Sequence, residues 1–182
     1  MRKNVSEPNS TDEHIYNKLC ITTYRRAFKF LQIMCENNCQ DGKNMIRKQE
    51  GKAKQFNFID IATKELRNLF QIFCFDIREV PLYLLDFILE VTQVPIYENQ
   101  AALMSSTFFE DLCQLKSQFT FNDEDLKTKK LHETNFEDFS HVNEIFYKSF
   151  EIILSNFEGN DDKTFIALDN KLESKFLMEV ML

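Results

Sequence analysis

Apolar residues recur along this chain at three- and four-residue steps or their multiples, the spacing that places side chains on one face of an α-helix. The first such stretch predicts a helix over residues 12–38, with Thr11 as its N-cap, and a short helix over residues 41–48 follows it. In the first helix the predicted core stripe consists of Ile15, Leu19, Ala27, Phe30, Leu31 and Met34.

The same spacing predicts five further helices. Asn57 is a suitable N-cap for the third helix, and Pro81 fits the first turn of the fourth. Pro95 ends the fourth helix, because a proline disfavours helical geometry in the residue before it. The predicted ranges are 58–76, 81–93, 98–118, 136–157 and a last helix that starts after Asp161 or Asp162 and includes Phe176.

Seven helices without strands predict an all-α fold, which can be a bundle, a helical array or a solenoid. Residues 1–10 are polar and are expected to form a flexible N-terminus, and residues 11–182 are expected to form one domain. The longest polar stretch, residues 119–134, is predicted to be a loop.

Composition narrows the class of protein. The net charge of −7 argues against a general nucleic-acid-binding protein, which needs a basic surface. The five Cys are an odd number and the N-terminus lacks an apolar run, so we expect free thiols in a reducing, cytosolic environment. The longest apolar segment, residues 80–91, contains two acidic residues and is too short to span a bilayer, so we expect no direct membrane insertion.

Catalytic motifs are missing from the sequence. It contains no glycine-rich phosphate loop, no Gly-x-Ser-x-Gly elbow and no His-Glu-x-x-His pair. No motif or spacing pairs any of the three histidines, His14, His132 and His141, with a nucleophile. We therefore predict that the chain is not an enzyme.

Two cysteines four residues apart, Cys35 and Cys39, suggest a zinc site. Zinc needs three or four ligands and there is no second pair, so buried free thiols are the better interpretation. The basic residues after them are interpreted as a solvated face in preference to a binding site for a phosphate or an acidic partner. These residues are Lys43, Arg47, Lys48, Lys52 and Lys54.

Acidic residues give the other candidate site. Asp86, Glu90 and Gln93 form one stripe of the fourth helix, and Glu36 lies off the core stripe of the first helix. Taken alone, each is best interpreted as a solvated side chain. If the two helices pack side by side, however, their oxygens can converge on a hard cation such as calcium.

At these residues the chain resembles a known family, the RIH-associated domain of ryanodine and inositol trisphosphate receptors, which are intracellular calcium-release channels. The family's run reads roughly Leu-Gln-x-Leu-Cys-Glu-Asn-His-Asn, then Gln-Asn, then Leu-Arg-x-Gln. Residues 31–39 read Leu-Gln-Ile-Met-Cys-Glu-Asn-Asn-Cys, and Lys43-Asn44 and residues 46–49, Ile-Arg-Lys-Gln, follow without a gap.

Two further stretches extend the resemblance to about residues 28–170. The family's Leu-Thr-Glu-Tyr-x-Gln-Gly-Pro-Cys-x-x-Asn-Gln is similar to residues 89–100, Leu-Glu-Val-Thr-Gln-Val-Pro-Ile-Tyr-Glu-Asn-Gln, with a shift of the leading Leu. Residues 157–160, Phe-Glu-Gly-Asn, with Ile166-Ala167, are similar to the ryanodine receptors' Leu-Glu-Gly-Asn and following Ile-Ala.

The resemblance implies an armadillo-like helical array and a calcium site. In the channels the matching glutamates supply carboxylates to the activating calcium site, so Glu36 and Glu90 are the implied calcium ligands. Asn38 and Gln93 are the implied supporting residues, and Asn38 replaces the family's His. Two carboxylates give at most four oxygens and calcium takes six to eight, so we expect weak binding by the isolated domain, about millimolar.

The function that the resemblance implies is that of a cytosolic regulatory domain, or a fragment of one, that senses calcium and couples it to channel gating. Its partners would be other domains of a tetrameric channel, above all the pore-coupled C-terminal region. Its place would be the cytosolic face of an intracellular membrane such as the endoplasmic reticulum. The alternative is a free-standing helical adaptor that binds partner proteins without calcium.

Overall fold

The computed structural model describes residues 10–71, 77, 79–93, 96–118, 136–157, 166 and 171–172. These residues form seven helices and no strand, which confirms the predicted all-α class; the armadillo-like arrangement stays a prediction. The helices are α1 (Ser10–Cys35), α2 (Gln40–Arg47), α3 (Phe58–Gln71), α4 (Val80–Thr92), α5 (Tyr97–Ser105), α6 (Phe108–Gln118) and α8 (Phe136–Phe157).

The predicted helix starts are confirmed where local capping decides them. The Asn57 side chain accepts hydrogen bonds from the backbone N–H groups of Ile59 (3.1 Å) and Asp60 (3.5 Å) and so caps α3. Pro81 lies in the first turn of α4. Thr11 as an N-cap is wrong, because α1 already begins at Ser10. The predicted loop at 119–134, the N-terminal residues 1–9 and nearly all of the last predicted helix lie outside the described residues.

The single helix predicted over 98–118 is wrong, because the chain breaks into α5 and α6 at Ser106 and Thr107. The Ser106 hydroxyl accepts a hydrogen bond from the Phe108 backbone N–H (3.2 Å), which is an N-cap for α6. The Thr107 hydroxyl donates to Asp111 at 2.8 Å. Side chains that bond their own backbone compete with helix continuation, and apolar spacing does not register this competition.

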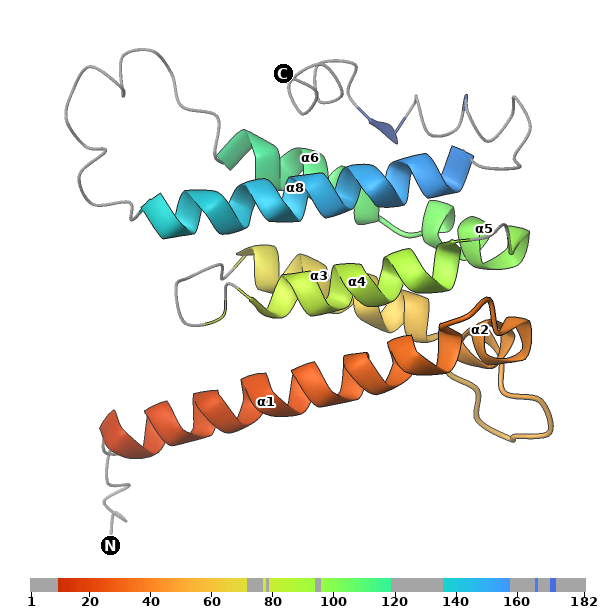
Figure 1. Ribbon diagram of the computed structural model, residues 1–182, viewed down its shortest axis with the longest axis horizontal. Helices are drawn as coiled ribbons and strands as arrows, with labels where there is room; N and C mark the ends of the chain where they lie inside the picture. The colour runs from red at the N-terminus through yellow and green to blue at the C-terminus, as the bar shows by residue number, and fades with distance from the viewer. Residues whose placement is uncertain are drawn as a thin grey trace, which may run out of the picture.

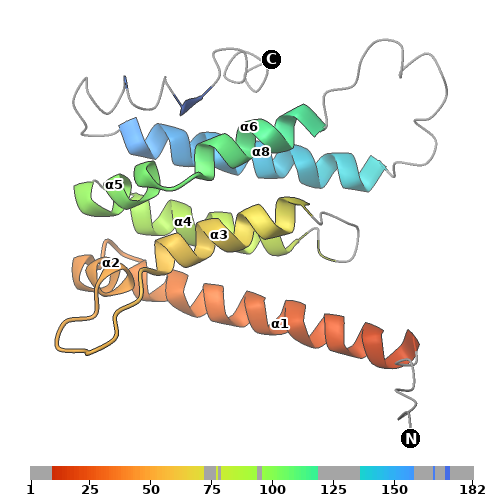
Figure 2. The same ribbon diagram turned by 180° about the vertical axis from the view of Figure 1, so that it is seen from behind.

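The described helices form two layers (Figure 1). Helices α1, α4 and α8 run side by side in one layer, and Figure 2, seen from the other side, shows α3 and α6 in front of them. The short helices α2 and α5 lie together at one end, where α1 and α4 also end. Helix α4 is therefore the central element, with neighbours on both sides and behind.

The core follows from this arrangement. Helix α4 buries Leu84, Leu85, Phe87, Ile88 and Val91 completely. No helix among the described residues is long and apolar enough to cross a membrane.

The predicted core stripe of α1 is wrong at three of its residues and confirmed at Leu31. Leu19 and Phe30 are 64% and 62% exposed, and Ala27 is exposed as well. Helix α1 is an outer helix that contacts α4 and α2, so only one narrow stripe is covered. That stripe comprises Ile21, Tyr24, Phe28, Leu31 and Cys35.

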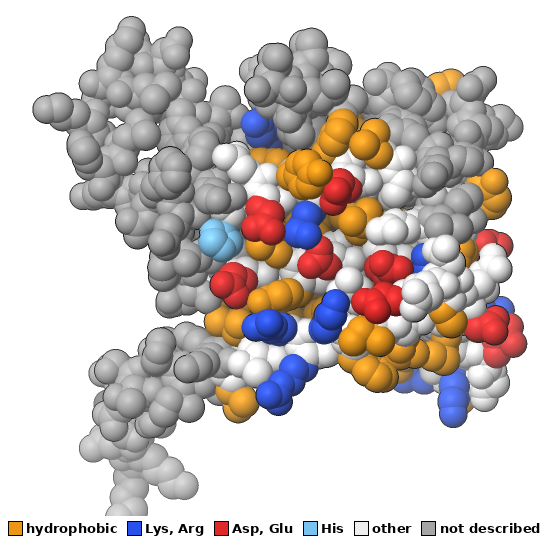
Figure 3. Space-filling view, viewed as in Figure 1, with side chains coloured by type: hydrophobic (Ala, Val, Ile, Leu, Met, Phe, Trp, Pro, Cys, Tyr) orange, Lys and Arg blue, Asp and Glu red, His pale blue; other side chains and the backbone are white. Residues whose placement is uncertain are grey.

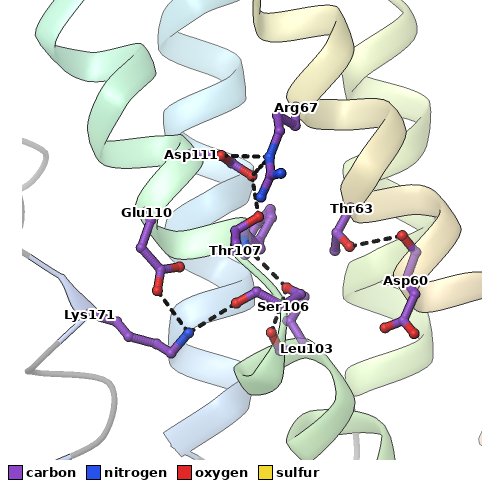
Figure 4. Close-up of polar contacts among 10 residues, drawn as sticks. Asp60, Thr63, Arg67, Leu103, Ser106, Thr107, Glu110, Asp111 and Lys171 are labelled. Atoms are coloured by element: carbon purple, nitrogen blue, oxygen red, sulfur yellow. Dashed lines mark hydrogen bonds and ion pairs between the residues drawn. The ribbon is translucent and has the colours of Figure 1, made fainter.

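Polar contacts join the second layer (Figure 4). Arg67 of α3 donates to both carboxylate oxygens of Asp111 in α6, at 3.1 and 3.0 Å. Lys171 donates to Glu110 and to the Ser106 carbonyl, each at 2.9 Å. The α5–α6 break is thus held from two sides.

Candidate functional site at the α1–α4 seam

The first helix ends in a turn made of polar residues. The Glu36 backbone N–H still donates to the Gln32 carbonyl (3.1 Å), and Asn37 and Asn38 then adopt left-handed backbone conformations, with φ of 56° and 58°. Asparagine tolerates this region better than most residues. The turn reverses the chain, so that α2 returns against the end of α1. The side chain of Asn38, a predicted supporting residue, is exposed.

The return of α2 depends on a close approach at Gly42. A Cβ atom added there would lie 2.0 Å from the Met34 carbonyl oxygen of α1. Asp41 and Gly42 both lie within α2, where the short helix over residues 41–48 was predicted. Gly42 is needed for the contact between the two backbones, and this contact fixes the position of the next residue, Lys43.

The predicted solvated basic face is wrong at Lys43, which is 1% exposed. Its Nζ atom donates to the backbone carbonyl of Gln93, just past the end of α4, at 2.8 Å. A lysine at this position satisfies a terminal carbonyl and complements the negative end of the helix dipole. Its burial is therefore compensated by a specific partner.

Three successive carbonyls at the end of α4, those of residues 91–93, are capped by buried side chains. Asn99 donates to the first at 3.1 Å, Gln100 to the second at 3.3 Å and Lys43 to the third at 2.8 Å. Because the last carbonyls of a helix have no partner within it, these bonds satisfy groups that burial would otherwise leave unpaired.

The two amides also tie other helices to this end. Asn99 donates to the Lys43 carbonyl (3.2 Å) and accepts from the Arg47 side chain (3.0 Å), both in α2. Gln100 donates to the Ser155 carbonyl of α8 at 2.8 Å. Helices α2, α4, α5 and α8 therefore meet in one polar network.

The two predicted calcium ligands lie on either side of the seam between α1 and α4. Glu36, the residue after the end of α1, pairs with Lys29 of that helix, with 3.6 Å between Oε1 and Nζ. Burial raises the pKa of the half-buried Glu90; the positive charge of Lys43 lowers this pKa, Glu36 raises it and Lys29 lowers it. The charges of Glu36 and Lys43 therefore both act on Glu90.

The buried thiol beside these charges is a protonated one. Burial raises the pKa of Cys35 to about 11, against a lowering by Lys43, and Glu90 and Cys39 raise it further. A thiol with this pKa is a poor metal ligand at neutral pH. The zinc interpretation therefore gains no support from Cys35.

The remaining residue of the acidic stripe, Asp86, is engaged elsewhere. It forms an ion pair with Lys148 of α8. Figure 3 shows the surrounding face, with acidic side chains over α4 and α8 and basic ones over α1. In the described part of the chain there is no group of three or more His, Cys, Asp and Glu that could hold a metal ion.

Of the predicted residues, the structure brings Glu36, Glu90 and the Gln93 backbone to the seam. Sequence reasoning missed the network of Lys43, Asn99 and Gln100. Their signal was present, because Lys43 lies in the first stretch of resemblance and the Asn-Gln pair closes the second. Hydrophobic spacing alone marks all three as exposed polar residues.

A comparison with protein families matches residues 18–116 to the family described as RyR and IP3R Homology associated. This segment is more than half of the chain and contains the whole α1–α4 seam. No curated protein matches the chain. The chain therefore belongs to the RyR and IP3R Homology associated family, which is found in ryanodine and inositol trisphosphate receptor channels.

Proposed function

We propose that this protein is a regulatory domain of a calcium-release channel and that its α1–α4 seam carries part of a calcium-sensing site. Glu36 and Glu90 are the proposed ligands. The observation that carries the proposal is the packing of α1 against α4, with Glu36 just after the end of α1 and Glu90 in the last turn of α4, within the segment that matches the family. The chain has no catalytic role in this proposal.

The oxygen atoms that Glu36 and Glu90 offer are of the type that calcium binds. Calcium prefers carboxylate and carbonyl oxygens, and a cation beside Glu36 and Glu90 would relieve the repulsion that raises the pKa of Glu90. Two carboxylates supply at most four of the six to eight oxygens that calcium takes. The other ligands therefore come from a further segment, for which the pore-coupled C-terminal region of a channel is the proposed source.

The position of the seam suggests how binding would act on a channel. Glu36 lies at the end of α1 and Glu90 in the last turn of the central helix α4. Calcium held between this domain and a pore-coupled element at the cytosolic face of an intracellular membrane would favour the arrangement in which its ligands converge. Only that difference in affinity between two arrangements can shift a gate.

A second function, a helical adaptor for partner proteins, is favoured by one observation. The outer face of α1 leaves Leu19, Phe30 and Ile33 more than half exposed. Exposed apolar residues on one helix are typical of protein interaction sites. This function needs neither Glu36 nor Glu90, so the calcium experiment separates the two.

The experiment is a calcium titration of the full chain, with the melting temperature as readout and magnesium as the ionic control. We expect stabilisation at about millimolar calcium, as for loosely chelated sites. Glu36→Gln and Glu90→Gln should each abolish it. The matched control is Glu144→Gln, which changes an exposed glutamate of α8 and should respond like the unmodified chain. Equal responses from all four proteins would refute the calcium role.

A further inference from the structure

A buried lysine is unusual, and Lys43 is among the largest side chains that are fully buried in the described part of the chain. An ammonium group loses its hydration on burial, which is costly unless partners replace it. Lys43 has one direct partner, the neutral Gln93 carbonyl, and its charge also acts on Glu90. Glu90 therefore lies within the electrostatic range of Lys43, whose direct contact is the Gln93 carbonyl.

Besides burial, the pKa of Glu90 is shifted by one other carboxylate and two ammonium groups. Two carboxylates, Glu36 and Glu90, face two ammonium groups, Lys29 and Lys43. The two lysines differ in burial, because the Lys29 side chain is 55% exposed and its ion pair is weakened by water. Lys43 is therefore the effective internal cation.

We infer that Lys43 is a built-in cation of the α1–α4 seam that takes the electrostatic place of a divalent ion and competes with calcium for the Glu36–Glu90 pair. The inference rests on the proposed calcium role of these two glutamates. It adds how the site is regulated. The fixed positive charge of Lys43 keeps the affinity of the site for calcium low, and it balances the charge of Glu90 when calcium is absent.

Lys43 cannot easily leave the seam. Its backbone carbonyl is held by Asn99, and the preceding Gly42 touches the end of α1. Its ammonium group caps the Gln93 carbonyl at 2.8 Å. Calcium at the Glu36–Glu90 pair would therefore meet a positive charge that stays in place, and like charges repel more strongly in a partly buried site than in water.

The test uses two substitutions of the full chain, Lys43→Met and Lys43→Gln. Methionine keeps much of the buried stem, and glutamine keeps a hydrogen-bond donor. Calcium affinity is measured by titration with melting temperature and amide NMR shifts as readouts. We expect calcium to bind on the order of tenfold more tightly to both variants than to the unmodified chain. Adding Glu90→Gln should abolish the gain.

The control is Lys64→Met, which removes an exposed lysine of α3 and the same unit of net charge. It should leave the calcium affinity unchanged. If it tightened binding as much as Lys43→Met, the effect would come from overall charge and the inference would be wrong.

The outcomes separate this inference from the proposed function. Glu90-dependent calcium binding by the unmodified chain, with unchanged affinity in both Lys43 variants, would overturn the inference and leave the proposed function standing. No Glu90-dependent binding in any of these proteins would overturn both. If a Lys43 variant unfolds without calcium, the inference requires calcium to restore folding in a Glu90-dependent way, and failure to restore it would refute the inference.

Discussion

The middle and the end of α4 are held in opposite ways. In the middle, Leu84, Phe87 and Ile88 are completely buried in the apolar core, and Phe28 of α1 contacts the Phe87 ring with 5.6 Å between centroids. At the end, buried polar side chains from α2 and α5 cap three carbonyls. Apolar packing supplies free energy without direction, whereas the capped end fixes which groups face the seam.

The difference teaches where stability and function can be separated. A substitution in the middle of α4 should lower the free energy of unfolding without selecting any one polar contact. A substitution at the end should cost less stability and move the groups that surround Glu90. The predictions below test this separation, from the largest expected effect to the smallest.

The largest loss is expected from Phe87→Ala in the middle of α4. Removing a fully buried phenylalanine leaves a cavity and should lower the free energy of unfolding by about 3–5 kcal/mol. Urea unfolding measures this loss. The matched control is Phe30→Ala, which removes a ring that is mostly exposed and should change stability by less than about 0.5 kcal/mol. Similar losses in the two variants would contradict the assignment of the core stripe of α1.

Gly42→Ala should come next. Its new Cβ would meet the Met34 carbonyl oxygen at 2.0 Å, and the backbones of α1 and α2 must separate to accept it. We expect a loss of about 1–3 kcal/mol. Gly51→Ala is the control without a clash, because nothing lies within 4 Å of its Cβ position and only its φ of 72° is strained. The account fails here if Gly42→Ala is as stable as the unmodified protein.

Asn99→Ala tests the capped end itself. It leaves the Val91 carbonyl without its side-chain donor in a buried setting, which should cost about 1–3 kcal/mol. Hydrogen exchange should show faster opening at the end of α4 than in its middle. Asn68→Ala, at an exposed position of α3, is the control and should be nearly neutral. Uniform exchange along α4 in Asn99→Ala would argue against a separate polar end.

The smallest effect concerns the charge of Glu90. Its pKa is raised by burial and by Glu36, so the folded state favours the protonated form despite Lys43. The stability that protonation gives is present below the unfolded pKa and is lost as the pH rises through the folded pKa. Glu90→Gln should therefore exceed the unmodified protein in stability at neutral pH and lose this advantage below pH of about 4. Thermal unfolding across this pH range is the measurement. If Glu90→Gln were less stable than the unmodified protein at pH 7, the prediction would be contradicted.

Much of the fold could be predicted because it depends on local signals. Spacing, the Asn57 cap and Pro81 placed most helices, and the apolar residues Leu84, Phe87, Ile88 and Val91 of α4 are buried, as helical spacing requires. The prediction of the core stripe of α1 failed in part, because the neighbouring helices decide which apolar residues of an outer helix are covered. The prediction of one helix over 98–118 failed because side-chain hydrogen bonds of Ser106 and Thr107 compete with helix continuation.

The candidate site also contains residues that the sequence indicated and one whose role it did not. Glu36 and Glu90 were found through resemblance, whereas the burial of Lys43 was not predicted, because its cause is a carbonyl fifty residues away in the sequence. A lysine in a polar segment is usually solvated. It becomes a cap and a counter-charge only because the fold brings α2 to the Gln93 carbonyl at the end of α4.

The most direct test of the calcium role is an amide NMR titration of the full chain with calcium chloride. The proposal predicts shifts at about millimolar calcium that concentrate at residues 35–38 and 89–93, from both sides of the seam, and that disappear in Glu90→Gln. Shifts spread evenly over the acidic surface, or an unchanged response in Glu90→Gln, would contradict a calcium site at the α1–α4 seam.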